Sequence, residues 1–308
     1  MSAIDPTTAL STPTARSIDA GGLELRLWDH GGSAERNVLF LHGYLDTGRS
    51  FDHLLTHLAG DLRALCLDWR GHGDSPWAPP GGSYHPWDHA KDLVWALRRL
   101  EEEGTRIDAV VAHSMGGNIA MLTAGAQPRR VPRVLLIDAF GPPAEPLAEQ
   151  PARLGRMMQS MLTVKRFRAF DTWDAAVDRM LETNFKLTRD GARLMALHGV
   201  APDPDNPDTF TFRFDPRLRG PTPFRFEEPF WTSLLSRITA PMTLIRAGHG
   251  YVPRTEVFDG RVASCSDLRV VELPEDGHHL HVMRPDVIAQ EVRALLARPT
   301  STDGQSAG

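Results

Sequence analysis

The residues that could do chemistry begin with a serine at a predicted turn between a strand and a helix. The apolar run 110–112 is typical of a buried strand, and small or apolar residues recur at helical spacing over 119–124. Ser114 lies between them, with the small residues Ala112 and Gly116 two positions away on either side. Larger side chains would collide there, because so sharp a turn forces the serine into a sparsely populated backbone conformation. The pattern predicts a serine hydroxyl above the sheet, at a helix N-terminus that favours negative charge.

A second stretch can supply groups that hold a developing negative charge. The apolar run 37–44 predicts a central strand that ends in His42-Gly43, and Gly43 lets the backbone turn at the strand end. The amide of Tyr44 is then free to point into a cleft, and we expect it to form an oxyanion hole with the amide of Met115. Residues beside the two turns are expected to contact the substrate, namely His42, Gly43 and His113. The alternative for each stretch is a plain turn without chemistry.

Histidines near the end of the chain can act as the base that a serine nucleophile requires, because a hydroxyl is a poor nucleophile until its proton is removed. His278 follows Gly277 after the last predicted strand, and His279 and His281 are competing candidates. Clustered histidines can also bind a metal ion, but residues 278, 279 and 281 lack a companion carboxylate pattern such as H-E-x-x-H. The sequence therefore predicts a general base among His278, His279 and His281, and it predicts neither a metal nor a cofactor.

The elements that must position these residues alternate between strand and helix. Strands are predicted at 23–28, 37–43, 62–67, 110–112, 133–137, 241–248 and 268–273. Helices are predicted at 50–58, 86–103, 116–124, 254–263 and 285–297. Such alternation predicts an α/β fold with a mostly parallel central sheet and helices on both faces.

A segment of different character interrupts the alternation. Residues 144–237 contain predicted helices at 147–162, 173–184 and 188–197, and then an aromatic, Pro- and Arg-rich piece at 210–224 without a clear strand. We interpret this segment as a mainly helical cap, inserted between core parts 17–143 and 238–298, with disordered polar ends at 1–16 and 299–308. Its apolar residues can line a substrate pocket or fill the core of the cap: Met157, Met158, Met161, Phe167 and Phe170. Of these, we expect Met157, Met161 and Phe170 to contact the substrate.

The composition excludes several other classes of protein. The 308 residues are 41% hydrophobic and 24% charged, which is ordinary for a globular chain with a large core. The net charge is −5 and basic residues are scattered, so we expect no binding to nucleic acid or to an anionic membrane. Two cysteines cannot form a disulfide framework. The sequence shows no signal peptide and no 18-residue apolar run, which favours a cytoplasmic protein with a small-molecule substrate. It does not indicate an oligomeric state.

Four motifs, in order, resemble those of the α/β-hydrolase superfamily over nearly the whole chain outside the cap. They are His42-Gly-Tyr44, Asp68-Trp-Arg-Gly-His-Gly-Asp-Ser75, Ala112-His-Ser-Met-Gly-Gly117, and Gly277-His278 with Pro285 seven residues later. Within the superfamily the chain looks most like the serine hydrolase-like proteins, through Asp215-Pro-Arg-Leu218 and the His-His-Leu-His cluster. The resemblance implies a nucleophile elbow at Ser114, where Ala112 departs mildly from the usual G-x-S-x-G, and a catalytic His278.

The acid of the implied triad is the point at which the chain departs from the superfamily. The commonest position, three residues after the glycine that follows the seventh strand, holds Tyr251, which cannot serve. Some branches place the acid at the end of the sixth strand, where this chain has Asp138. The carboxyl end of that parallel strand should lie beside Ser114. We therefore expect Asp138 to be the acid, with three rivals in a predicted helix or an exposed turn: Glu256, Asp259 and Asp276.

These residues together predict a serine hydrolase that cleaves carboxylic esters through an acyl-enzyme. Ser114 would attack the carbonyl, His278 would act as base and then acid, and Asp138 would orient the imidazole. Cleavage of thioesters, amides or C–C bonds is possible with the same machinery. A non-catalytic ligand-binding protein of the same fold is the alternative from another class, because an absent acid at Tyr251 is what a decayed triad would show.

Overall fold

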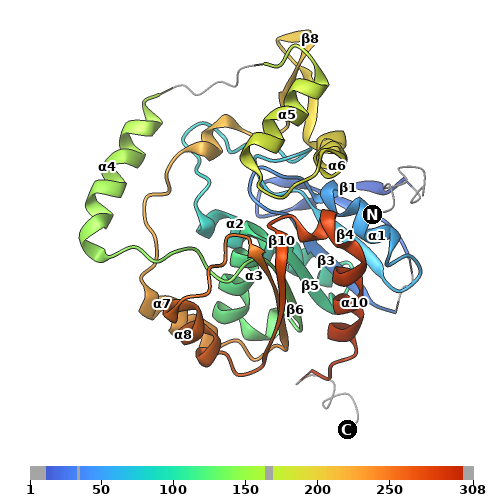
Figure 1. Cartoon of the computed structure of the whole chain (residues 1–308), viewed down its shortest axis with the longest axis vertical. Helices are drawn as coiled ribbons and strands as arrows, with labels where there is room; N and C mark the ends of the chain where they lie inside the picture. The colour runs from blue at the N-terminus through green and yellow to red at the C-terminus, as the bar shows by residue number, and fades with distance from the viewer. Residues whose placement is uncertain (1–11, 33–34, 164–168, 301–308) are drawn as a thin grey trace.

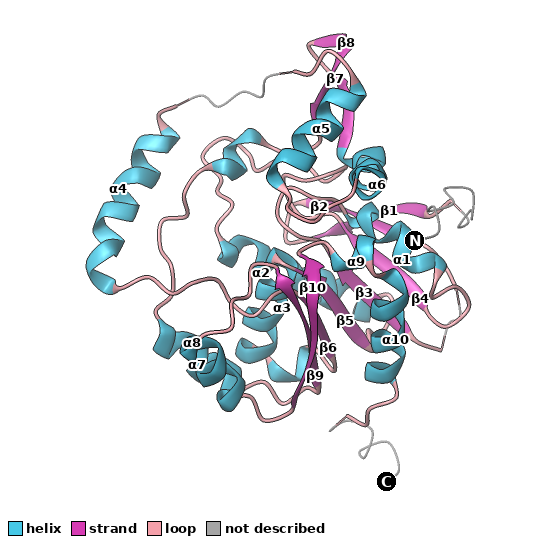
Figure 2. Ribbon diagram, viewed as in Figure 1, coloured by secondary structure: helices cyan, strands magenta, loops and turns pink. Residues whose placement is uncertain are grey.

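The computed structural model describes residues 12–32, 35–163 and 169–300, and the centre of this part is an eight-stranded sheet (Figures 1 and 2). The strand order is β1-β2-β4-β3-β5-β6-β9-β10. Strands β4 to β10 of this order run parallel, whereas β1 pairs antiparallel with β2, and β2 with β4. The strands are β1 Thr14–Asp19, β2 Glu24–Asp29, β3 Asn37–Leu41, β4 Arg63–Leu67, β5 Ala109–His113, β6 Val134–Ile137, β9 Met242–His249 and β10 Leu268–Gly277. The predicted fold class is confirmed.

Helices cover both faces of the sheet, and two separate apolar clusters fill the layers between. One cluster joins the sheet to α2 Pro86–Glu102, α3 Met115–Ala126, α7 Glu228–Ser236 and α8 Glu256–Ser264. The other joins the opposite face to α1 Asp52–Thr56, α9 Leu280–Met283 and α10 Pro285–Leu296. Every residue of β5 and β6 is buried, as expected of central strands covered on both faces. This burial fixes the positions of the strand ends, which carry the candidate site.

The segment between β6 and β9 holds helices and a small second sheet, none of which joins the main sheet (Figure 1). Its elements are α4 Gln150–Met161, α5 Trp173–Thr183, α6 Arg189–Gly199, β7 Val200–Asp203 and β8 Asn206–Phe212. The absence of a strand at 210–224 was a wrong prediction, because β8 extends into that stretch and pairs antiparallel with β7. Phe210 and Phe212 alternate with threonines there, which is the period of a strand. The surrounding proline and arginine residues obscured that signal.

Two other expectations about the ends of the predicted segments need correction. The predicted disordered N-terminal end, 1–16, overlaps the edge strand β1, which begins at Thr14 and pairs with β2 along its whole length. The rest of that end, 1–11, and most of the C-terminal one, 301–308, lie outside the described residues. Helix α7, inside the range predicted for the cap, packs in the core cluster through Trp231 and Leu235.

In the described part of the chain, no helix has both the length and the apolar character needed to cross a membrane.

A buried carboxylate, Asp215, connects the segment between β6 and β9 to the core through hydrogen bonds. Asp215 is 1% exposed, and its backbone amide donates a hydrogen bond to the carbonyl of Gly71. Its carboxylate accepts hydrogen bonds from the Tyr84 hydroxyl at 2.5 Å and from Nε of Arg217 at 2.8 Å. Arg217 in turn donates to the carbonyl of Ala78 at 2.6 Å. The stretch 215–218 therefore positions the segment over the loops that follow β4.

Candidate active site

Ser114 occupies the sharp turn between β5 and α3. Its backbone angles are φ 52° and ψ −117°, a combination that L residues seldom adopt. The turn packs closely against β3, since a Cβ atom on Gly116 would lie 2.4 Å from the carbonyl oxygen of Leu41. Only glycine fits there. The structure thus places the serine at a strained strand-to-helix corner, next to the N-terminus of α3, as the sequence predicts.

Asp138 and His278 meet directly beside this corner. The amide of Ser114 donates to the carbonyl of Ile137 at 3.0 Å, which makes Asp138 the next residue along the neighbouring strand end. Its carboxylate Oδ2 lies 2.5 Å from Nδ1 of His278. Asp138 is 1% exposed and has φ 44°, a second strained position in the site. The predicted pairing of this acid with this histidine is therefore present in the geometry.

The loop after β9 holds the Asp138 carboxylate in place. The amide of Tyr251 donates to Oδ2 at 2.8 Å, and the amide of Ala247 donates to Oδ1 at 3.2 Å. A Cβ atom on Gly250 would lie 2.1 Å from Oδ2, so the carboxylate fills the space that a side chain would need. The ring of Tyr251 lies 4.3 Å from that of His278, between centroids. Tyr251, at the position where the superfamily more often has its acid, thus binds the Asp138 carboxylate through its backbone amide.

The three rival acids lie elsewhere. Asp276 forms an ion pair with Arg284 at 2.7 Å, and Asp259 forms one with Arg254 at 3.2 Å. Glu256 is exposed at the start of α8. Among the described residues, none of the three lies beside His278, because the His278 ring is hydrogen-bonded to Asp138.

Ser114 opens into a cavity of about 520 Å³ between the core and α4. Met115 and Tyr44, the residues whose amides are expected to form an oxyanion hole, both line it. Met115 is the first residue of α3, where amides have no acceptor within the helix. The apolar part of the wall comes from both core and inserted segment: Ile119, Leu122, Met157, Met161, Leu218, Phe224, Phe226 and Trp231. The cavity matches the size of common small-molecule sites.

Four of the predicted substrate contacts do not line this cavity. Phe170 packs in the separate core of α5, α6 and β8, where its ring lies 5.2 Å from that of Phe212. His42 is fully buried, and its ring nitrogens lie 2.7 Å from the Gly43 carbonyl oxygen and 3.0 Å from the Trp69 amide. Burial lowers the pKa of His42. His42 therefore stabilises the turn that follows β3.

Gly43 and His113 pack beneath the corner. A Cβ atom on Gly43 would lie 2.7 Å from Nδ1 of His113 and 3.2 Å from Cβ of Ser114, so only glycine allows this approach. His113 is 1% exposed. Of the predicted cap contacts, Met157 and Met161 line the cavity, whereas Met158 is 60% exposed and does not. Phe167 lies outside the described residues.

Sequence reasoning missed the aromatic wall of the cavity and its paired charges. Trp231, Phe224 and Phe226 lie in a stretch with no periodicity that marks a site. Arg153 lines the cavity but donates to Glu145, with Nη2 and Oε1 2.7 Å apart. Such partners are distant in sequence or depend on the fold, so no local signal identifies them.

The hydrogen bonds recorded for the described residues do not include one between the Ser114 hydroxyl and His278. In free enzymes this bond is often long and tightens only when substrate is bound. The ring of His278 is nevertheless close to the corner, because its centroid lies 4.5 Å from that of His113, the residue before the serine. The arrangement can supply a nucleophile, a base and an acid within one buried cluster.

Comparison with known proteins agrees with this architecture. Residues 38–291 match the model of the alpha/beta hydrolase family, and the chain belongs to that family. It is similar to the serine hydrolase-like protein of Danio rerio, with 25% identity over 93% of this chain and 89% of the other. It is also similar to the 3-hydroxybutyrate-oligomer hydrolase of Cupriavidus necator, with 28% identity over 82% of this chain and 86% of the other. The resemblance to serine hydrolase-like proteins is confirmed.

Among solved structures, a hypothetical protein from Pseudomonas aeruginosa superimposes with a TM-score of 0.83 and 29% identity. The match covers 92% of this chain and 99% of that one. The chain is thus an alpha/beta hydrolase with serine hydrolase-like relatives, and its likeness extends through the segment between β6 and β9.

Proposed function

We propose that this protein is a serine hydrolase that cleaves carboxylic esters through an acyl-enzyme, with Ser114, His278 and Asp138 as its triad. The observation that carries the proposal is the contact of 2.5 Å between Asp138 and His278 beside the strained Ser114 corner. The open cavity above that corner would hold the acyl group. We further propose that residues 144–237 act as a cap over the core parts 17–143 and 238–298.

In the proposed reaction, His278 Nε2 takes the proton of the Ser114 hydroxyl as its oxygen attacks the ester carbonyl carbon. The carbonyl oxygen becomes negative, and the amides of Tyr44 and Met115 donate hydrogen bonds to it. The tetrahedral intermediate expels the alcohol, which takes the proton from His278. Water, deprotonated by His278, then attacks the acyl-enzyme and releases the acid and the free serine. Asp138 stays ionised throughout and stabilises the imidazolium.

Neutral ester substrates fit the walls of the cavity. Three arginines line it: Arg153 pairs with Glu145, Arg217 pairs with Asp215, and the charge of Arg225 also interacts with Glu145. The remaining wall is largely aliphatic and aromatic. A bound anion would have to compete with existing ion pairs, whereas an apolar acyl chain would bury surface against methionine and aromatic side chains. The relative named 3-hydroxybutyrate-oligomer hydrolase suggests short hydroxyacyl esters as one candidate class.

The proposal is tested by comparing acyl substrates that differ only in the leaving group. We expect hydrolysis of p-nitrophenyl esters and of 3-hydroxybutyrate dimers, with slower turnover of the matched thioester and p-nitroanilide. A higher kcat/KM for the thioester would show that the protein is a thioesterase, and a higher value for the anilide would show that it is an amidase. If the folded protein turns over none of them but binds an ester in the cavity, the non-catalytic alternative is correct.

Side chains of α4 are expected to set acyl-chain preference. Replacing Met157 or Met161 by alanine enlarges the cavity, so kcat/KM for long acyl chains should rise relative to that for acetate. A change of about threefold to tenfold is expected, because one or two methylenes in an apolar pocket contribute about 1 kcal/mol. The measurement is kcat/KM across p-nitrophenyl esters of increasing chain length.

Met158→Ala is the matched control, because Met158 lies on the same helix and is as exposed as Met161 but does not line the cavity. It should leave the ranking of chain lengths unchanged. If Met157→Ala and Met161→Ala lower all esters in equal proportion, these side chains only fill space, and α4 does not contact the acyl group.

A further inference from the structure

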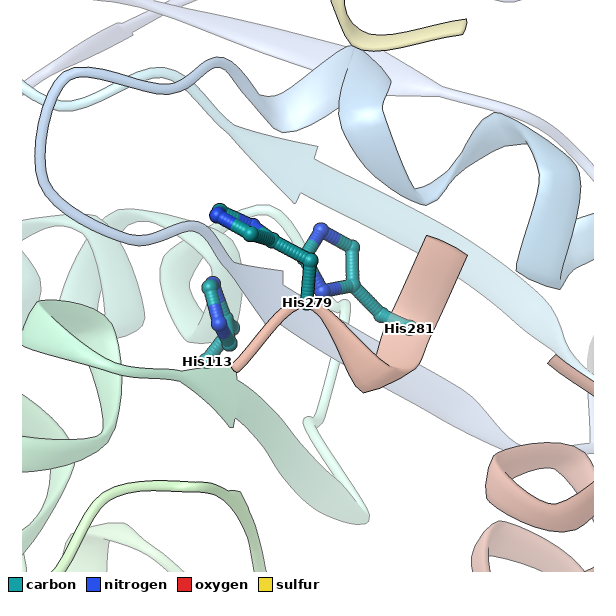
Figure 3. Close-up of side chains that lie close together, drawn as sticks. All are labelled: His113, His279 and His281. Atoms are coloured by element: carbon teal, nitrogen blue, oxygen red, sulfur yellow. The ribbon is translucent and has the colours of Figure 1, made fainter. Parts of the chain in front are cut away.

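Three buried histidines beside the candidate active site have no role in the proposed reaction. They are His113 at the end of β5, His279 just before α9 and His281 within α9. Figure 3 shows the three imidazoles gathered between the strand end and the short helix. One ring nitrogen of each lies within 4.8 Å of the other two, and the side chains are 1%, 8% and 0% exposed.

The hydrogen bonds of two of these rings show which nitrogen carries the proton. Nε2 of His113 lies 3.0 Å from the carbonyl oxygen of His278, which can only accept, so this nitrogen donates. Nε2 of His279 lies 2.8 Å from Oδ1 of Asn184, whose amide nitrogen already donates to the carbonyl of Met180. Nε2 of His279 therefore donates as well. In each ring the lone pair is left on Nδ1, and neither Nδ1 atom has a hydrogen-bond partner.

The third ring, His281, is completely buried, and within the described part of the chain neither of its nitrogens has a hydrogen-bond partner. The nearest charge is the Asp46 carboxylate, with Oδ2 3.7 Å from Nε2 of His281. Asp46 is itself buried and also accepts hydrogen bonds from the Ser50 hydroxyl and the Thr47 amide. Buried polar atoms without partners are uncommon in native proteins and call for an explanation. Here three neighbouring rings each have at least one such nitrogen.

We propose that His113, His279 and His281 bind a divalent transition-metal cation of the Zn²⁺ type through one ring nitrogen each. Neutral imidazole is a preferred ligand of Zn²⁺, Cu²⁺ and Ni²⁺, and three histidines with an open fourth position form a common zinc arrangement. Metal-binding histidines usually donate their other N–H to a carbonyl, amide or carboxylate oxygen. The His278 carbonyl and Asn184 accept such bonds from His113 and His279, and Asp46 lies near the third ring.

The protonation state of the imidazoles and the distances between their nitrogen atoms are compatible with binding a metal ion. Burial and the neighbouring histidines hold the pKa of His113 well below its usual range and lower that of His279 to about 3, so both rings are neutral. Nitrogen atoms around a tetrahedral Zn²⁺ lie about 3.3 Å apart, so a spacing of up to 4.8 Å requires a modest closure. Rotation of the side chains can supply it. The buried Asp46 carboxylate would offset part of the charge of the cation.

A cation at this site would act on the neighbouring base. The ring of His278 lies 4.5 Å from that of His113 and 5.2 Å from that of His279, between centroids. Closure of the rings around a cation would move His113 and His279, which respectively precede Ser114 and follow His278 in the chain, and would disturb the geometry of the proposed triad. We therefore expect the metal to inhibit ester hydrolysis. This consequence rests on the proposed function, whereas the binding site does not.

The test is a titration of the full chain, free of any histidine tag and stripped with a chelator, with Co²⁺ and with Zn²⁺. We expect one equivalent of Co²⁺ to give the intense visible absorption of a four-coordinate ion, and Zn²⁺ to displace it. Zn²⁺ should also raise Tm, because it binds the folded state. His279→Gln and His281→Gln should each weaken Zn²⁺ binding at least about 100-fold, and Asn184→Ala about 10-fold.

The matched control is His57→Gln, which changes an exposed histidine on the surface next to α1 and should leave binding unaltered. Circular dichroism checks that each variant is folded, and if His281→Gln is not, His279→Gln decides. Equal affinity of wild type and His279→Gln, or a Co²⁺ spectrum of the octahedral aqua type, would overturn the site. Inhibition is read separately from ester turnover. Tight binding without inhibition would keep the site and remove the inhibitory role.

Discussion

Replacing Ser114 by alanine is expected to abolish covalent labelling by a fluorophosphonate and to lower ester turnover by about 10⁵- to 10⁶-fold. A loss of this size follows when the nucleophile of a triad is removed, because the remaining groups act as a unit and have no oxygen to activate. The fold should persist, since the Ser114 side chain makes no recorded hydrogen bond and alanine differs only by the hydroxyl. The measurements are gel fluorescence after labelling, mass mapping of the adduct and steady-state kinetics.

Ser160→Ala is the matched control, because this second serine also lines the cavity. Its hydroxyl lies on a helix surface and donates to the carbonyl of Met157 at 2.9 Å. Among the described residues, no basic side chain is hydrogen-bonded to it. Labelling and turnover of this variant should match those of wild type. An adduct on any residue other than Ser114, or no adduct on the folded protein, would contradict the proposed hydrolase.

The serine corner and the central strands could be predicted from the sequence because their signals are local. Continuous apolar runs mark strands covered on both faces, and β3 spans Asn37–Leu41, within the strand predicted from Asn37 to His42-Gly43. Ser114 was recognisable because its tight turn demands small neighbours, and a Cβ atom on Gly116 would lie 2.4 Å from the carbonyl oxygen of Leu41 in β3. Topology then gave Asp138, since neighbouring parallel strands end at the same edge of the sheet.

Other features depend on contacts that a local pattern cannot reveal. Phe170 and Met161 both read as apolar cap residues, yet one packs against β8 and the other lines the cavity. The sequence grouped His279 and His281 with His278, whereas the fold pairs His278 with Asp138 and brings His113 to the other two. The contacts that decide this grouping join residues far apart in the chain, since Asp138 and His278 are 140 residues apart and His113 and His278 are 165 apart. The grouping could only be found from the structure.

Asp138→Asn is expected to keep the fold and to lower kcat by about 10³- to 10⁴-fold, the effect seen when a triad carboxylate is neutralised. In wild type, Oδ2 faces both His278 and the Tyr251 amide, and Oδ1 faces the Ala247 amide. An asparagine has one oxygen, so one backbone N–H must face its amide nitrogen, at a cost of about 1–3 kcal/mol in unfolding free energy. The measurements are kcat with a p-nitrophenyl ester and denaturant unfolding.

The loss of turnover has a specific cause that separates it from the loss of stability. With the asparagine NH₂ group towards His278, Nδ1 must accept, so the proton moves to Nε2, which can then no longer take the Ser114 proton. Asp276→Asn is the matched control, because Asp276 lies two residues before His278 but pairs with Arg284. It should leave kcat near wild type. If Asp138→Asn turns over normally while a change at Glu256 or Asp259 abolishes activity, the acid is misassigned. If none of these changes matters, His278 acts without a carboxylate and the triad is wrong.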